Sequence, residues 1–292
     1  MLLKSVFIGF LSFSILHADI LKECKTEADK ISGCVVKEYD SNVDIWIETP
    51  YKNGKKEGIE KLYDESGKLW RETPYKNGRF DGILKRYYEN GNLRAEIPYK
   101  NDKFEGITKQ YYENGKLERE IPYKNGKREG MVKLYYENGN LEIEIPYKND
   151  KREGMVKWYY KTGQLQSETP FKNDKQEGIE KAYYINGNLM AETPYKDNKI
   201  NGIAKWYYEN GNLASEIPHK NDEAHGDLKY YTEDKKLLAT INAQNDKFIS
   251  GKCPNNKALT DKDLTEIRRE DINIEQEINY LKEICLKESD SK

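Results

Sequence analysis

The sequence predicts an all-β protein: an elongated, single-layer antiparallel meander of about eight 24-residue β-hairpin repeats, followed by a C-terminal α-helix. Three observations lead to this fold class. Prolines recur every 24 residues from Pro50 to Pro218, glycines keep the same step, and Asn-Gly pairs separate short runs rich in Tyr, Ile and Leu. Repetition at a fixed period of this size is the signature of a repeat architecture, in which each unit packs mainly on its neighbours.

The composition argues against a conventional two-layer core. Of the 292 residues, 34% are charged, and 49 Lys+Arg nearly cancel 51 Asp+Glu to a net charge of −2. Hydrophobic residues make up 36%, including 23 Tyr, against about 45–50% apolar residues in an ordinary globular domain. The 12% aromatic content argues against disorder. The balanced charge lacks the Lys/Arg excess that nucleic-acid binding needs, so we expect no nucleic-acid partner.

Residues 1–18 predict a cleavable secretory signal. Lys4 gives a positive start, Val6 to Leu16 form a short apolar run, and Leu16-His17-Ala18 is a small-residue cleavage site. The alternative is a membrane anchor, but the run is shorter than the ~18–20 residues that a span needs. No other apolar run approaches that length. We therefore expect a periplasmic or secreted mature chain without a membrane span.

Four cysteines lie near the two ends of the chain: Cys24, Cys34, Cys253 and Cys285. An even count in an exported protein indicates disulfides, with three pairings open. The local pairs Cys24–Cys34 and Cys253–Cys285 are the simplest, because joining the two ends would require the sheet to close on itself. Zinc-type Cys-x-x-Cys and Cys/His spacings are absent from the sequence, so we predict no metal site and no cofactor.

These patterns divide the chain into four segments. Residues 1–18 are the signal peptide, 19–48 an N-terminal cap with a degenerate repeat, 49–251 the repeat array, and 252–292 a C-terminal capping helix. The degenerate repeat is recognised because Trp46 aligns with Trp70 of the next unit.

One repeat unit begins at Gly82 and contains two strand-like runs, Ile83 to Glu89 and Asn92 to Lys100. Asn90-Gly91 between them predicts a two-residue loop with a type I′ turn, which needs positive φ at both central residues. Asn101-Asp102 then forms a second tight turn before the next unit. The Pro and paired Gly of every unit exclude helices.

This register predicts that Tyr88 faces Leu93, that Arg86 faces Ala95 and that Lys85 faces Glu96. The Lys–Glu pair recurs in successive units, and the predicted structural ladder includes Lys85, Glu96, Lys109, Glu120, Lys133 and Glu144. Directly opposed opposite charges contribute roughly 0.2–1 kcal/mol a pair. We interpret the ladder as fixing the register and keeping one face soluble, since a catalytic pair would not be copied in every unit.

Tyrosines divide between the two faces. Tyr87, Tyr111 and Tyr135 share the face of the lysines, whereas Tyr88 and its equivalents point the other way. We expect each ring to stack on its neighbours one repeat away while its hydroxyl stays in contact with water.

The last segment predicts an amphipathic helix that begins at Thr260, which can cap it together with Asp263. An apolar stripe at spacings of mainly three to four residues, interrupted by Asp271, contains Leu264, Ile267, Ile274, Ile278, Leu281 and Cys285. We favour a capping helix that covers the edge of the last strand. A dimerising coiled coil is the alternative, and Asp271 counts against it.

The string YKNGKREG at residues 123–130, followed by MVKLYYENGNL, resembles the MORN repeat in its shorter bacterial variant form. The resemblance covers about residues 34–251, and departs from the eukaryotic type in having Glu129-Gly130 in place of His-Gly; His225-Gly226 is the single exception. It implies elongated β-sheet modules used for protein association. Some bacterial members are labelled antitoxins of the YwqK type, which with an export signal would become an immunity-like role.

The leading functional hypothesis is a non-enzymatic, exported repeat scaffold that binds another protein. The alternative is a cell-wall or glycan-binding module, since aromatic faces stack on sugars and attract quaternary amines. Its aromatic platform would be Trp46, Trp70, Trp158 and Trp206. Other units fill the slot of Trp158 with Arg or Ala, which argues against a dedicated sugar site. No Ser/His/Asp set or phosphate-binding loop is present in the sequence, so we predict no catalytic activity.

Overall fold

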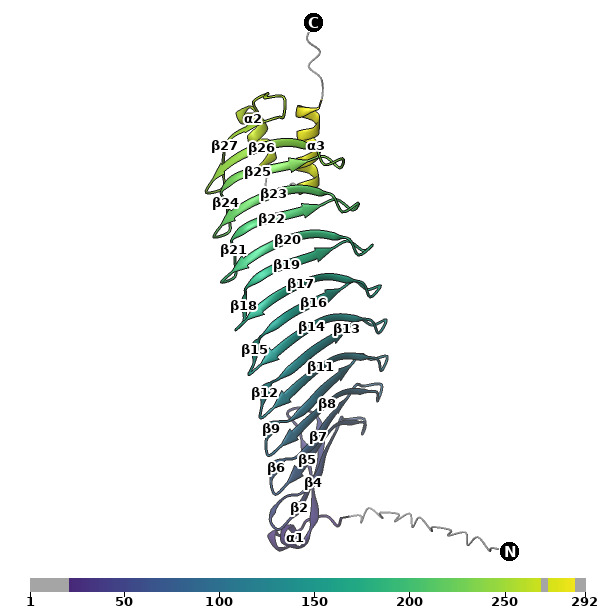
Figure 1. Cartoon of the computed structure of the whole chain (residues 1–292). Coiled ribbons are helices and arrows are strands. Elements are labelled where there is room, and N and C mark those ends of the chain that lie inside the picture. The colour runs from purple at the N-terminus through teal and green to yellow at the C-terminus, as the bar shows by residue number, and fades with distance from the viewer. Residues whose placement is uncertain (1–20, 269–272, 287–292) are drawn as a thin grey trace, which may run out of the picture. The chain divides into compact units, whose positions relative to one another are not determined.

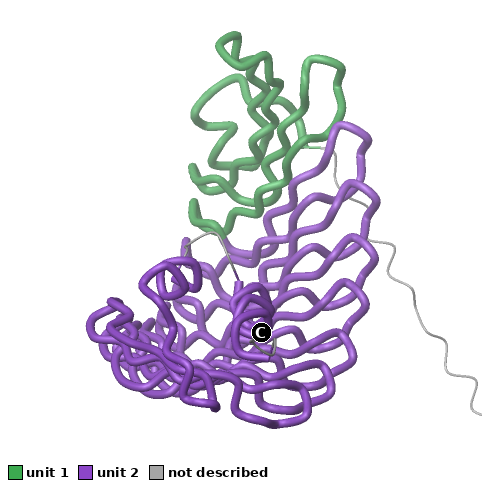
Figure 2. The backbone as a smooth tube through the Cα atoms, turned by 90° about the horizontal axis from the view of Figure 1, so that it is seen from above, with its two compact units in different colours: residues 1–80 green, residues 81–292 purple. Residues whose placement is uncertain are grey.

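The computed structural model describes residues 21–268 and 273–286. The predicted signal peptide and Asp271 therefore lie outside the described residues. The chain divides into two compact units, residues 1–80 and 81–292, shown in green and purple in Figure 2. Each unit is taken by itself below.

Unit 1 holds a short helix and six antiparallel strands that follow one another along the chain. Its elements are α1 (Glu27–Ser32), β1 (Cys34–Asp40), β2 (Ile45–Lys52), β3 (Lys55–Lys56), β4 (Gly58–Tyr63), β5 (Leu69–Lys76) and β6 (Arg79–Phe80). The degenerate repeat is the β1–β2 hairpin, in which Lys37 faces Glu48 and Tyr39 faces Trp46.

Unit 2 continues the same pattern through seven hairpins and ends in two helices (Figure 1). Its strands are β7 (Gly82–Tyr87), β8 (Leu93–Lys100), β9 (Lys103–Phe104), β10 (Gly106–Tyr111), β11 (Leu117–Lys124), β12 (Lys127–Arg128), β13 (Gly130–Tyr135), β14 (Leu141–Lys148), β15 (Lys151–Arg152), β16 (Gly154–Tyr159), β17 (Leu165–Lys172), β18 (Lys175–Gln176), β19 (Gly178–Tyr183), β20 (Leu189–Lys196), β21 (Lys199–Ile200), β22 (Gly202–Tyr207), β23 (Leu213–Lys220), β24 (Glu223–Ala224), β25 (Gly226–Tyr231), β26 (Leu237–Gln244) and β27 (Lys247–Lys252). The helices are α2 (Asp261–Ile267) and α3 (Ile274–Cys285). The prediction of an all-β antiparallel meander with a 24-residue period is confirmed.

Of the two turns in each repeat, the tight turn at Asn101-Asp102 is found as predicted, and the other differs from its predicted type. Asn101 and Asp102 have φ of 46° and 66°, so the type I′ turn lies between β8 and β9. The prediction of a type I′ turn at Asn90-Gly91 is wrong, because only Gly91 there has a positive φ, of 84°. The Gly91 amide donates to the Tyr88 carbonyl at 2.9 Å, which closes a longer loop.

That longer loop shifts the strand pairing beside it. Lys85 faces Glu96 and Arg86 faces Ala95, the register that the sequence predicts. Beyond a register shift, however, Leu93 faces Tyr87 rather than Tyr88. The loop with a single left-handed glycine adds a bulge, as three- to five-residue hairpin loops do.

A glycine–proline contact recurs where each two-residue strand passes into the next long strand. Gly130 has φ of +116°, and a Cβ built there would lie 3.2 Å from Cγ of Pro122. Glycine is required for both reasons, and its missing side chain lets the proline of the preceding hairpin pack against the backbone.

Successive hairpins are joined by tyrosine hydroxyls. Tyr88 donates to the carbonyl of Tyr111 at 2.7 Å, and five further tyrosines repeat this bond one unit along: Tyr112, Tyr136, Tyr160, Tyr184 and Tyr208. The sequence predicts only that these hydroxyls stay in contact with water, whereas in the structure each also donates to a backbone carbonyl. Each one holds the next hairpin through a hydrogen bond to a backbone acceptor.

One face of the unit 2 sheet also carries a buried row, formed by Leu84, Thr108, Val132, Val156, Ala204 and Leu228. Near the type I′ turns, rings stack on one another between hairpins: the centroid of Phe104 lies 4.8 Å from that of Tyr99 and 4.9 Å from that of Tyr123. The sheet therefore buries side chains between neighbouring repeats rather than under a second layer.

Among the residues that the structure describes, a cluster of buried hydrophobic side chains lies at the C-terminal end of unit 2. Leu264, Ile267, Ile278 and Leu281 of the two helices pack with buried residues of β25 and β26 such as Tyr230. The sequence predicts one helix over the last strand edge, whereas two helices cover the sheet face that carries the buried row. Two capping boxes explain the division: Thr260 caps α2, and Asn273 starts α3 separately.

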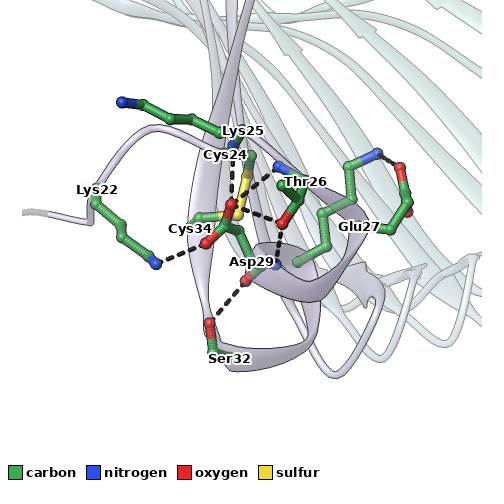
Figure 3. The surroundings of a disulfide bond; sticks show 9 residues. Lys22, Cys24, Lys25, Thr26, Glu27, Asp29, Ser32 and Cys34 are labelled. Carbon is green, nitrogen blue, oxygen red and sulfur yellow. Dashed lines mark hydrogen bonds and ion pairs between the residues drawn. A yellow bond between two sulfur atoms is a disulfide. The ribbon is translucent and has the colours of Figure 1, made fainter.

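Disulfides fasten both ends, as Cys24–Cys34 and Cys253–Cys285. Figure 3 shows the first beside α1, a helix that the sequence analysis missed although Thr26 and Asp29 form a capping box. The Lys22 ammonium, with further bonds from Thr26 and Lys25, holds the pKa of Asp29 well below its usual range. Lys22, Asp29 and the disulfide thus fix the chain against the start of β1.

We expect the substitution Gly130→Ala to lower the free energy of unfolding more than Gly139→Ala. Gly139 also has positive φ, of +96°, but a Cβ there meets nothing within 4 Å, so only backbone strain of about 1 kcal/mol applies. At Gly130 the contact with Pro122 adds to the strain, for about 2–3 kcal/mol in total. Urea unfolding followed by circular dichroism measures both. Equal midpoints for the two variants would contradict the packing role of the proline.

We also expect the C-terminal core to lose stability as the pH rises from about 4.5 to about 7. Burial raises the pKa of Glu277 from 4.5 to about 7, although Tyr230 donates to it at 2.8 Å and acts in the opposite direction. The folded state holds this proton more tightly than the unfolded state, so deprotonation favours unfolding. His219, Asp246 and Arg268 line the same cavity.

Thermal unfolding of wild type and Glu277→Gln across this pH range tests the assignment. The variant keeps a neutral side chain at every pH, so its midpoint should change less than that of wild type. Identical pH profiles for the two proteins would contradict the assignment to Glu277.

Candidate interaction surface

The two faces of the unit 2 sheet have different chemistry. The face opposite the buried row is called the Lys face here, because one lysine of every hairpin lies on it. The C-terminal helices pack on the buried-row side. The Lys face is therefore the side of the sheet that unit 2's own helices do not cover.

A row of alternating charges crosses the Lys face from strand to strand. From Lys109 to Lys205, each lysine faces a glutamate in its own hairpin and another in the preceding one, as Lys109 faces both Glu120 and Glu96. In unit 2 this ladder consists of Lys85, Glu96, Lys109, Glu120, Lys133, Glu144, Lys157, Glu168, Lys181, Glu192, Lys205, Glu216 and Lys229, with Thr240 last.

Ion pairs of the ladder are loose. The Nζ–Oε1 distance is 3.9 Å for Lys109–Glu120, 3.8 Å for Lys133–Glu144 and 3.6 Å for Lys205–Glu216. Half-exposed pairs of this kind contribute little each, roughly 0.2–1 kcal/mol. Their charges remain open to a partner on the same face.

Tyrosines of the Lys face bond to the ladder. The Tyr135 hydroxyl donates to Glu120 at 3.2 Å, and Tyr111 donates to Glu96 at 3.0 Å. Burial, together with the Glu96 carboxylate, raises the pKa of Tyr111 to about 12. Each glutamate therefore accepts a phenol from the next hairpin and faces lysines on both sides.

Beside the ladder runs a row of exposed aliphatic side chains, called the aliphatic row here: Ile83, Ile107, Met131, Met155, Ile179 and Ile203. Their relative exposures lie between 37% and 52%. Each directly faces a proline of the adjacent strand, as Ile107 faces Pro122 and Met131 faces Pro146. An apolar stripe of this length on one face is typical of a protein–protein contact.

Sequence reasoning missed the aliphatic row. The sequence does contain a signal for it. In all six units, the residue after the glycine that recurs every 24 residues is Ile or Met. That these side chains are exposed follows only from the strand register and from the bend of the chain at the glycine. The row ends at β25, where Asp227 takes its place and faces Asn242.

The four tryptophans are divided between the two units. Trp46 and Trp70 lie in unit 1, where Tyr39 and Trp46 have ring centroids 4.9 Å apart. Trp158 and Trp206 lie on β16 and β22 of unit 2, on the face of the buried row. Trp206 packs against the C-terminal core. Of the two tryptophans of unit 2, Trp158 is the exposed one.

Other kinds of site find little support. The described residues hold no group of three or more His, Cys, Asp or Glu side chains placed to bind a metal ion. Among the helices that the structure describes, none has the length and apolar character needed to cross a membrane.

Comparison with known families identifies the chain. The family model described as MORN repeat variant matches seven tandem segments: residues 56–77, 80–101, 104–125, 128–149, 152–173, 176–197 and 200–221. These cover more than half of the chain, so the protein belongs to the MORN repeat variant family, a family of repeat scaffolds. No curated protein matches the chain.

We expect five tyrosines to ionise near pH 12 rather than near pH 10. They are Tyr111, Tyr159, Tyr183, Tyr207 and Tyr208. A phenol whose pKa is raised by folding keeps its proton longer in the folded state, so stability should fall as the pH rises from 10 to 12.

Absorbance at 295 nm during a base titration measures phenolate formation, and circular dichroism reports whether the fold persists. The substitution Tyr111→Phe should reduce the amplitude of the late phase by one tyrosine. A single transition near pH 10 in a protein that remains folded would contradict the hydroxyl–glutamate bonds.

Proposed function

We propose that this protein is an exported, non-enzymatic repeat scaffold that associates with another protein chain through its Lys face. The aliphatic row is the observation that carries the proposal. Six exposed Ile and Met side chains stand on one face at the spacing of the hairpins, beside a ladder whose charges balance. Apolar anchors next to paired charges are the ordinary composition of a protein interface.

Export is supported by two features. The first 18 residues have the composition of a secretory signal, and both disulfides are typical of proteins that fold in an oxidising compartment. An immunity-like or antitoxin-like role outside the cytoplasm is compatible with this scaffold, and would make the bound chain a toxin.

A non-enzymatic role is supported by the uniformity of the repeats. The charged and phenolic groups of the Lys face recur in the six hairpins from β7 to β23, where each lysine faces a glutamate. Active sites, by contrast, gather unlike groups with strongly shifted pKa values at one place. Glycan binding draws less support, because Trp206 is engaged in the C-terminal core.

Site-specific photocrosslinking in intact cells tests the proposal. A photoreactive phenylalanine analogue at Ile107 or Ile179 should give a crosslinked protein adduct, since both side chains are half-exposed in the aliphatic row. Ile185, 57% exposed outside the row, is the matched control position. Absence of adducts at both row positions, or equal adducts at Ile185, would overturn the assignment of the Lys face.

Fractionation of the same cells tests the export part. Recovery of the disulfide-bonded chain in the periplasm or medium is expected. Retention of a reduced chain in the cytoplasm would contradict export while leaving the interaction surface standing.

A further inference from the structure

We propose that the Lys face of unit 2 is covered by a second copy of the same chain. The two copies would be related by a two-fold axis that runs parallel to the strands and passes between β14 and β16. This inference rests on the proposed function, since it takes the Lys face to be a protein-binding face and names its occupant.

Two kinds of strand alternate across the Lys face. One kind carries an aliphatic residue and a lysine two positions later, as β13 carries Met131 and Lys133. The other carries a glutamate and a proline two positions later, as β14 carries Glu144 and Pro146. Aliphatic residue faces proline and lysine faces glutamate in each of the six hairpins from β7 to β23.

This alternation makes the face complementary to itself. The two-fold axis reverses the order of the strands, so a strand of the first kind always meets a strand of the second kind. Lys157 then lies over Glu144 of the second copy, and Lys133 lies over its Glu168. The same operation brings Met155 over Pro146 of the second copy, and the remaining eight of the twelve strands follow in the same way.

The shape of the Lys face, with protruding and recessed side chains, fits this arrangement. Ile and Met side chains of the aliphatic row are up to 52% exposed, whereas each proline packs into the space of a glycine in the next hairpin, with 2.9–3.2 Å between proline Cγ and the position of a glycine Cβ. Protruding side chains therefore meet recessed ones. Met131 and Met155 flank the axis, where their unbranched side chains can adapt to each other.

The dimensions are those of a stable dimer. Twelve strands at about 4.8 Å span roughly 50 Å, and the width from the aliphatic row to the ladder tyrosines is roughly 15 Å. The resulting area, about 750 Å² from each copy, is close to the typical share of a specific interface. An axis parallel to the strands also keeps the strand directions of the two sheets aligned, as in packed β-sandwiches.

Other occupants fit the face less well. Its lysines and glutamates are equal in number from Lys85 to Glu216, so neither a polyanion nor a polycation is favoured. The self-complementary pattern also ends where the C-terminal core begins, because β25 carries Asp227 and β26 carries Thr240 in place of the glutamate. Within unit 2 the pattern spans the six hairpins from β7 to β23, whose centre lies between β14 and β16.

Sedimentation equilibrium of the full disulfide-bonded chain tests the proposal. Wild type should sediment at twice the mass of one chain, and Met131→Glu/Met155→Glu should sediment as a monomer. The matched control Ile185→Glu/Ile249→Glu introduces the same charges at positions that are more than 50% exposed outside the row, and should remain dimeric. Circular dichroism confirms that every variant is folded.

Charge reversal tests the register. Lys133→Glu and Glu168→Lys should each weaken dimerisation by tenfold or more, whereas the double variant restores opposite charges across the interface and should recover most of the affinity. Lys133 and Glu168 are not neighbours within one sheet, since Glu144 and Lys157 lie between them in the ladder. Recovery therefore cannot come from the ladder of a single chain.

Three outcomes would overturn the inference: a monomeric wild type, a dimer that survives Met131→Glu/Met155→Glu, or a double charge reversal as weak as its single variants. A monomeric chain that still crosslinks to a different protein at Ile107 would leave the proposed function standing and refute the second copy as occupant. Loss of both would refute the Lys face as an interaction surface.

Discussion

Contact between successive hairpins holds this protein together, because most of the sheet has no second layer against which to bury a face. Three repeated interactions supply that contact: the tyrosine hydroxyl on the next hairpin's carbonyl, the proline in the space of a glycine, and the charged ladder with its phenols. Each is local and is copied with the period of the chain. Stability therefore accumulates along the array, as expected for a one-dimensional repeat.

The inter-hairpin contacts also explain why the Lys face can bind another protein chain. Inter-hairpin contacts use the tyrosine hydroxyls and cover one side of each proline. They leave the Ile and Met side chains of the aliphatic row exposed. The ladder charges, at 3.6–3.9 Å from one another in three hairpins, are paired only loosely. Rearranging these ion pairs when a partner binds costs little free energy. Covering the aliphatic row removes apolar surface from water and favours binding.

Much of the fold follows from the sequence, since the period, the alternating strands and the Lys85–Glu96 register all depend on local chemistry. The errors are equally local in origin. Asn90-Gly91 carries the strongest short hairpin signal, yet the I′ conformation is found at Asn101-Asp102. Asn, Asp and Gly all tolerate positive φ, so composition identifies a turn without fixing the number of residues in it.

The sequence by itself determined the repeat architecture, the charged ladder and the positions of the two disulfide-bonded ends. Only the tertiary structure decided which apolar side chains are exposed. Leu84 and Ile83 are neighbours in one strand and equally apolar, but Leu84 is 5% exposed and Ile83 51%. Their difference arises because inter-hairpin contacts cover Leu84 on one face and leave Ile83 exposed on the other, and that is a property of the assembled sheet rather than of any single hairpin.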